Sequence, residues 1–179
     1  MTIGPVSKPD TMTPGYSVKA HYLDASALVK LVADDPDEEP GRDVLRKYYR
    51  EHSNRYATSY CVTEAFSAFK LKFLRGRIPE AKYITYVHEF IRTVIGANLQ
   101  IDEVSILLPV VRDEAERLIK TYQIDFLDCF QIVTVLQGRF RHFVAESQSI
   151  LITADRELAK AARAEGARVW ECTSEPAPR

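Results

Sequence analysis

An apolar strand that leads directly into an acid and then into a helix constrains the fold of this chain more than any other feature. In residues 21–32 a short apolar stretch precedes Asp24, and apolar side chains then recur at helical spacing. The same order returns in residues 149–162, where the strongest strand signal is followed by Asp155 and an alanine-rich helix. Strands that alternate with helices in this way predict an α/β fold with a parallel sheet.

Length and composition predict one domain. A chain of 179 residues can bury one hydrophobic core but is too short for two comfortable cores. We expect a flexible leader over 1–17, a single domain over 18–172 and a flexible tail over 173–179. No apolar run approaches the roughly 20 residues of a membrane helix, and the start lacks the order of a secretion signal. These features predict a soluble, cytoplasmic protein.

Charge is nearly balanced, with a formal net charge of −1, so overall charge does not indicate a nucleic-acid-binding protein. Charged residues nevertheless gather in the acidic stretch 34–39 and in the basic stretches 70–77 and 139–142. The simplest interpretation of each is a solvated face. Basic stretches that met on one rim could instead hold the phosphates of a nucleic acid.

The cysteines do not indicate a zinc site. Their spacings match no zinc motif, and their number is odd: Cys61, Cys129 and Cys172. We therefore expect reduced, buried thiols that act as small apolar side chains.

Hydrophobic periodicity and turn residues divide the chain into alternating elements. Strands are expected at about 20–24, 56–59, 99–104, 149–153 and 168–172. Helices are expected at about 25–33, 41–52, 60–74, 80–95, 109–122, 125–136 and 158–165. The helix over 60–74 carries apolar residues on two faces, which leaves little of its circumference for water.

Acids stand where the strands end and where apolar helices begin. Asp24 and Asp155 each follow a strand, and catalytic groups of open α/β sheets collect at the carboxyl ends of the strands. Asp125 and Asp128 lie three residues apart at the start of an apolar helix, so they share a helix face. Glu64 lies on the helix with two apolar faces, where a shielded carboxylate would need a partner.

Four of these acids also have a purely structural explanation. Asp24 or Ser26 can cap the helix that follows, because a side-chain oxygen there accepts bonds from free N–H groups. Asp125 fits an N-cap, and Asp128 fits a first helical turn, where the helix dipole favours negative charge. Glu64 can be an ordinary surface glutamate. These alternatives stay open on the residues alone.

Carboxylates that converge from several elements would need a cation. Two unit charges about 4 Å apart repel by about 4 kcal/mol at an effective dielectric constant near 20, so the group would raise its pKa values or move apart. Mg²⁺ and Mn²⁺ prefer such oxygen ligands. A divalent ion also clamps a phosphodiester and lowers the pKa of a bound water, which is the chemistry of metal-assisted phosphodiester hydrolysis.

Four segments together resemble the PIN domain family, in particular the VapC-type toxins of toxin–antitoxin pairs. They are Tyr22–Leu28, Thr58–Glu64, Asp128–Val133 and Leu151–Asp155. The resemblance covers about residues 21–171. Each segment alone is a weak signal, but four acids in the right order, each beside the right element, make the combined signal fairly strong.

The resemblance implies one acidic pocket for Mg²⁺ or Mn²⁺, formed by Asp24, Glu64, Asp128 and Asp155. Asp24 and Asp128 would be the most direct metal ligands. Glu64 would complete the site or act through water, and Asp155 would hold a second ion or an outer water. Ser26 and Thr153 match the hydroxyl residues that family members place beside the pocket.

The resemblance also implies the fold, the activity and the partners. It implies a three-layer α/β/α fold around a parallel sheet of about five strands, and endoribonuclease activity on RNA. It further implies inhibition by a cognate antitoxin and assembly as a homodimer. Two departures concern the third acid: Cys129-Phe130 stands where small residues are usual, and Asp125 is a rival to Asp128.

Two other functions remain as alternatives. The first is a catalytically silent PIN-like module that binds RNA or a protein, which degenerate acids would favour; here all four acids are present. The second is a phosphohydrolase that resembles the haloacid dehalogenase group. That group would need an acid two residues after Asp24, where this chain has Ser26, so we discount it.

Overall fold

Five short parallel strands form one sheet in the order β3-β2-β1-β4-β5. The structure is a computed structural model that describes residues 19–143 and 147–178, so the leader expected over 1–17 lies outside the described residues. The strands are β1 (His21–Leu23), β2 (Arg55–Ala57), β3 (Leu99–Ile101), β4 (Ile150–Thr153) and β5 (Arg168–Glu171). Every neighbouring pair runs parallel, which confirms the predicted parallel sheet.

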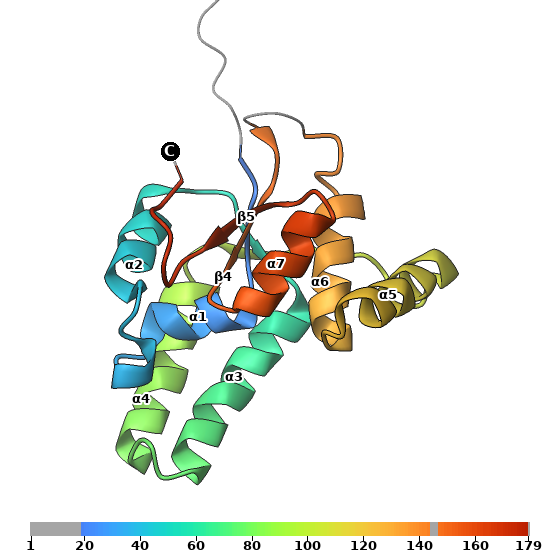
Figure 1. Ribbon diagram of the computed structural model, residues 1–179. Helices are drawn as coiled ribbons and strands as arrows, with labels where there is room; N and C mark the ends of the chain where they lie inside the picture. Colours follow the sequence, from blue (N-terminus) through green and yellow to red (C-terminus); the bar gives the residue numbers. More distant parts are fainter. Residues whose placement is uncertain (1–18, 144–146, 179) are drawn as a thin grey trace, which may run out of the picture.

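Helices cover both faces of this sheet (Figure 1). They are α1 (Ala25–Val32), α2 (Arg42–Glu51), α3 (Ser59–Leu74), α4 (Glu80–Glu89), α5 (Pro109–Tyr122), α6 (Phe126–Gln137) and α7 (Arg156–Ala164). Two short segments add to them: the 3₁₀ turn η1 (Pro36–Glu38) and the π-helical η2 (Phe90–Ile95). The three-layer α/β/α fold is therefore confirmed.

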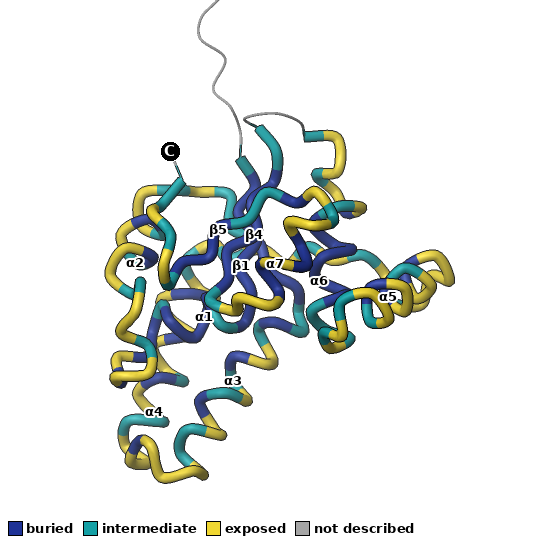
Figure 2. The backbone as a smooth tube through the Cα atoms, viewed as in Figure 1, coloured by how far each residue is buried: buried dark blue, intermediate teal, exposed yellow. Residues whose placement is uncertain are grey.

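The core lies in two layers because neighbouring strand residues point to opposite faces. Leu23 packs with residues of α1 to α4 on one face, whereas Tyr22 packs with residues of α5, α6 and α7 on the other. Figure 2 shows the buried residues concentrated in the strands and in the helix faces that meet them. The far ends of α3 and α4 and much of α5 remain exposed (Figure 2).

Two boundaries differ from the sequence prediction. β3 ends at Ile101 rather than near 104, because Glu103 leaves the sheet and its carboxylate accepts from the N–H of Ser59, at 2.8 Å, at the start of α3. The helix expected over 80–95 is α-helical only to Glu89 and continues as the π-helical η2. Gly96 N there donates to Ile91 O, five residues back, at 2.9 Å.

The residues after β5 contact the domain. Trp170 Nε1 donates to Glu175 O at 3.1 Å, and Arg163 of α7 forms an ion pair with Glu175 at 2.6 Å. The first residues of the tail expected over 173–179 therefore pack beside β5. No helix among residues 19–143 and 147–178 has the length and apolar character to cross a membrane.

The register of the central strands decides which side chains meet. Leu23 pairs with Ile152, and Asp24 N donates to Ile152 O at 3.0 Å. Because β1 and β4 are adjacent and parallel, the residues that follow them emerge side by side at the carboxyl edge of the sheet. The two segments with the order strand, acid and helix, one at Asp24 and one at Asp155, therefore lie side by side.

Candidate active site

Asp24 is the most deeply buried of the predicted site acids, with 6% of its surface exposed. It forms the N-cap of α1 and accepts from Ser26 N at 3.3 Å. Its carboxylate also accepts from Ser26 Oγ at 2.5 Å and from Thr153 Oγ1 at 2.8 Å. Asp24 is therefore a helix cap and a buried charge together, so the capping alternative is correct without excluding a site.

Ser26 and Thr153 fix the orientation of this carboxylate. All three hydrogen bonds from these two residues end on Oδ2 of Asp24, so none of them occupies Oδ1. Ser26 Oγ in turn accepts from Ala154 N at 2.8 Å, and Thr153 Oγ1 accepts from Asp155 N at 2.9 Å. The two hydroxyls predicted beside the pocket thus join the end of β4 to the start of α1.

Burial opposes the ionised form of Asp24. It raises the pKa of this carboxyl above the ordinary value, while the hydrogen bonds from Ser26 and Thr153 act in the opposite direction. A buried carboxylate with only neutral partners is costly, and a cation would relieve that cost.

Asp125 and Asp128 have different roles at the start of α6. Asp125 is the N-cap and accepts from Asp128 N at 2.9 Å, as the sequence predicts. Burial, followed by repulsion from Asp125 and Asp24, raises the pKa of Asp128 to about 8. Asp125 therefore satisfies the helix terminus, and burial beside other acids perturbs the carboxyl of Asp128.

Asp155 follows β4 and caps α7. Its Oδ1 accepts from Glu157 N at 2.7 Å and from Leu158 N at 3.0 Å. The side chain is exposed, yet its charge helps to raise the pKa values of Glu64 and Asp128. Asp155 therefore belongs to the same electrostatic group as the buried acids.

Glu64 of α3 completes this group from the α1 side of the sheet. Burial raises the pKa of its carboxyl, and repulsion from Asp24, Asp125 and Asp155 raises it further. An isolated surface glutamate would show no such coupling. Glu64 therefore faces the acids at the carboxyl edge. We call Asp24, Glu64, Asp128 and Asp155 the acidic site.

The described residues supply no cation to the acidic site. Within residues 19–143 and 147–178, none of its four acids takes part in an ion pair with Lys, Arg or His. The N-termini of α1, α6 and α7 lie beside it and favour negative charge. Burial acts in the opposite direction on Asp24, and burial together with repulsion between the acids does so on Glu64 and Asp128.

The donors fit a divalent ion by chemical type. Among the described residues, no three His, Cys, Asp or Glu side chains stand close enough to form a ready-made metal cage. Mg²⁺, however, usually keeps several waters and is bound through one or two carboxylates. Asp24 and Asp128 are the pair whose raised pKa values such an ion would lower.

A buried polar pair beside Asp24 was missed by the sequence prediction. Cys61 Sγ donates to Gln131 Oε1 at 2.9 Å and accepts from Thr58 Oγ1 at 3.1 Å. Burial, then the charge of Asp24, raises the pKa of the Cys61 thiol to about 12, so the thiol stays protonated. The available signal was Gln131 itself, an amide in the middle of an apolar helix, one turn after Asp128.

All three cysteines are free, buried thiols, as the sequence predicts. Cys129, next to Asp128, also has a raised pKa, chiefly through burial. None of them adds a thiolate to the acidic site.

Comparison with known protein families finds one match. The PIN domain family matches residues 21–164, which contain all four acids of the acidic site. The chain belongs to the PIN domain family. Family membership indicates a nuclease, and PIN domains usually use divalent metal ions.

A solved structure has a similar fold. PAE2754 from Pyrobaculum aerophilum superposes with a TM-score of 0.53 at 17% identity, covering 86% of this chain and 90% of that one. At this identity the likeness concerns the fold alone. No curated protein matches the sequence.

Proposed function

We propose that this PIN domain is a metal-dependent endoribonuclease, the toxin of a type II toxin–antitoxin pair of VapC type. The observation that carries the proposal is a group of four mutually coupled carboxylates with no cation from the described chain. Such a group suits a divalent ion and a phosphodiester better than it suits a structural role. The VapC-type motif around Asp24 supports the finer assignment.

Asp24 and Asp128 would hold the Mg²⁺ or Mn²⁺, with Glu64 and Asp155 as outer or additional ligands. When bound, the ion would clamp the phosphodiester and lower the pKa of a water. Ser26 and Thr153 keep the Asp24 carboxylate in one orientation, so it needs little reorganisation.

Glu64 is suited to move protons, because Asp24 and Asp128 would hold the ion. A bound ion would lower the pKa of Asp128, which is about 8 in the metal-free protein. The raised pKa of Glu64 makes its carboxylate a stronger base than an ordinary glutamate. Glu64 can therefore accept a proton from a water positioned beside the acidic site.

The proposed activity is tested by RNA cleavage with purified protein. Wild type, Asp24→Asn and Asp113→Asn are incubated with a mixed RNA substrate in Mn²⁺, in Mg²⁺ and in EDTA. Asp113 is an exposed acid of α5, so it provides the matched control. We expect cleavage by wild type and Asp113→Asn in either metal, and at least about a hundredfold less by Asp24→Asn. Full activity of Asp24→Asn would reject the assigned role.

The toxin assignment needs a separate measurement. Induced expression in a bacterial host should arrest growth for wild type but not for Asp24→Asn at equal protein level. The antitoxin is sought as a protein that binds the wild-type chain and restores growth. The expected homodimer is tested by measuring the molar mass of the purified protein with light scattering. RNA binding without cleavage would instead support the silent binding module.

A further inference from the structure

A second candidate site lies away from the acidic site, at the other end of α1. A cleft of about 640 Å³ opens between α2 and η2, and Leu31 and Val32, at the end of α1, form part of its wall. Asp24 caps the opposite end of this eight-residue helix, about 12 Å away at 1.5 Å per residue. The volume is within the usual range for small-molecule sites, roughly 300–1,000 Å³.

Two of the arginines that line the cleft are held rigidly by backbone oxygens. Arg46 donates to the carbonyls of residues 31–33, at 2.8 to 3.1 Å. Arg55 donates to His52 O at 2.8 Å and to Ala97 O at 3.1 Å. These bonds fix two positive charges in the wall without neutralising them.

Two further arginines bring guanidinium groups that the fold does not use. Arg50 of α2 and Arg92 of η2 both line the cleft and are exposed. In the described part of the chain, neither side chain has a hydrogen bond, an ion pair or a ring contact. Arg50 and Arg92 therefore keep all of their donors for a ligand.

The cleft is positive after its own acids are counted. Four arginines line it together with two acids, Asp34 and Glu89, so positive charge is in excess. Asp34 already has Lys82 as a partner, at 2.6 Å. Because a phosphate monoester carries about −1.5 to −2 at pH 7, its charge complements this lining.

The remaining walls are apolar. Leu31, Val94 and the ring of Tyr49 line the same cleft, so it can cover an uncharged ligand body as well as an anion. Arg55 lies over the Tyr49 ring, 3.9 Å from its centroid, which holds both side chains in place. A site with fixed apolar walls and a few free charged donors is typical of small-molecule binding.

The backbone beside the cleft is unusual in the same place. Arg92, Thr93 and Val94 belong to the π-helical η2, a conformation that is rare and frequent at functional sites. Arg92 comes from η2 and Arg50 from α2, so two different elements bring an arginine to the same cleft. We propose that this cleft binds a small organic phosphate, with Arg50 and Arg92 on the phosphate and the apolar wall against the rest.

Calorimetric titration of the full chain with adenosine 5′-monophosphate in EDTA tests the proposal. EDTA removes metal, so the acidic site repels the anion, and the outcome does not depend on the proposed nuclease activity. We expect saturable binding by wild type and by Asp24→Asn. The double variant Arg50→Gln/Arg92→Gln should bind at least about tenfold more weakly, because charge-assisted bonds to phosphate are lost.

Matched controls separate this site from general charge. Arg112→Gln changes an exposed arginine of α5 outside the cleft and should bind like wild type. Adenosine and inorganic phosphate should each bind at least about tenfold more weakly than the nucleotide, since each lacks one half of the ligand. Equal binding by wild type and the double variant, or no saturable binding by wild type, would overturn the proposal.

Discussion

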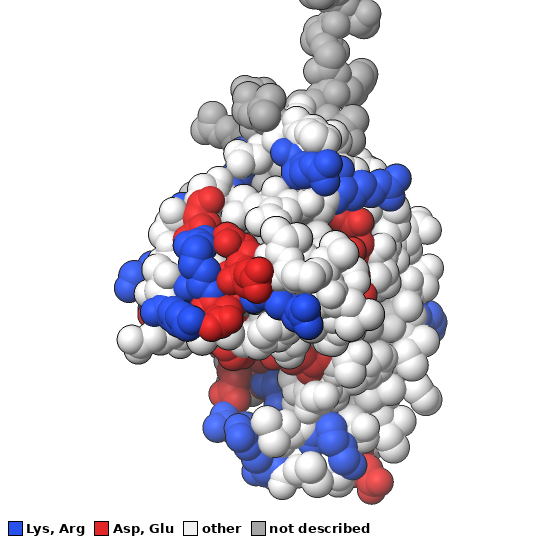
Figure 3. All heavy atoms as spheres, turned by 90° about the vertical axis from the view of Figure 1, so that its right-hand side faces the viewer, with Lys and Arg blue, Asp and Glu red and all other residues white. Residues whose placement is uncertain are grey.

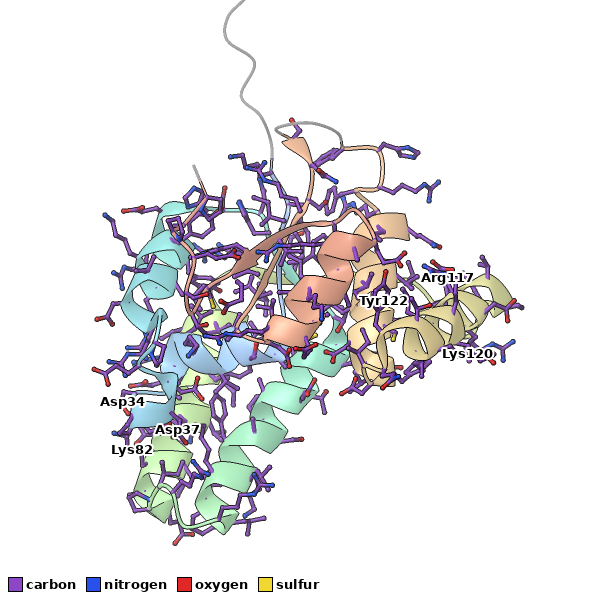
Figure 4. The ribbon with its side chains drawn as sticks, viewed as in Figure 1. Asp34, Asp37, Lys82, Arg117, Lys120 and Tyr122 are labelled. Atoms are coloured by element: carbon purple, nitrogen blue, oxygen red, sulfur yellow. The ribbon has the colours of Figure 1, made fainter. Side chains whose placement is uncertain are left out.

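Two groups of acids in this protein have opposite electrostatic surroundings. The acidic loop, residues 34–39, is surrounded by cations from α3 and α4. Lys72 Nζ lies 2.8 Å from Asp35 Oδ1 and 2.9 Å from Glu38 Oε1. Asp34, Asp37 and Lys82 lie together at this end of the molecule (Figure 4). The acidic site has no such partner among the described residues.

The pKa values follow this difference. The hydrogen bond from Lys82 lowers the pKa of Asp34, whereas burial raises the pKa values of Asp24 and Asp128. Paired acids stabilise a loop; buried acids without cations weaken the fold unless something binds them. The denser acidic stretch of the sequence is thus structural, and the dispersed acids form the candidate site.

The comparison also changes the interpretation of the basic stretch 70–77. Lys72 and Arg77 bind the acidic loop, with Arg77 2.5 Å from Asp37. They are therefore neither a simple solvated face nor free to hold nucleic-acid phosphates. On the side of the molecule that carries α5, acidic and basic side chains are also interspersed (Figure 3), as in the ion pair of Arg117 with Glu165.

Removing the cation that binds the acidic loop should have the largest effect on stability. Lys72→Met removes the cation but keeps most of the alkyl chain, and it leaves the buried Asp35 without its cation. We expect a loss of about 2–4 kcal/mol in the free energy of unfolding, measured by urea denaturation. Lys70→Met is the control. Lys70 belongs to the same helix but lies over aromatic rings, and among the described residues it forms no ion pair with the loop. A loss for Lys72→Met no larger than the control would contradict the comparison.

Adding a cation to the acidic site should stabilise it. Mn²⁺ at about a hundred times its dissociation constant should stabilise wild type by about 2.7 kcal/mol, seen as a higher melting temperature. Asp24→Asn should show little of this shift, and Asp113→Asn should show all of it. An equal shift in Asp24→Asn and wild type would place the ion elsewhere.

The Asp128 carboxyl should make the metal-free protein less stable as the pH rises. In the folded protein it keeps its proton up to about pH 8, but in the unfolded chain it loses the proton near the ordinary aspartate pKa of 3.8. The folded state therefore binds more protons between these values, and stability falls with rising pH in this window.

Asp128→Asn should flatten that dependence and stabilise the metal-free protein near pH 7. The gain should be about 1–2 kcal/mol, which allows for solvent screening of a half-buried group. Melting temperatures from pH 5 to pH 8 in EDTA provide the measurement, with Asp113→Asn as the control. A variant whose pH profile keeps the wild-type slope would show that Asp128 does not carry the raised pKa.

The sequence predicted the fold and the positions of the acids because both depend on local patterns. The strand, acid and helix order places Asp24 and Asp155, and the three-residue spacing places Asp125 and Asp128. Contacts between distant segments were not predictable in this way. The bond from Cys61 to Gln131 joins α3 to α6, and Lys72 reaches the loop from α3. The π-helical turn was also missed, because its apolar spacing resembles that of an α-helix.

The smallest effect is expected at the exposed edge of the acidic loop. Arg77 and Asp37 form an ion pair at 2.5 Å, but about half of each side chain is exposed. Exposed pairs contribute about 0–1 kcal/mol and are screened by salt. Arg77→Gln should therefore cost under about 1 kcal/mol in urea denaturation at low salt, and less still in 1 M NaCl. A cost as large as that of Lys72→Met would mean that the whole loop acts as one network. The burial of Asp35 would then not make Lys72 a stronger partner than Arg77.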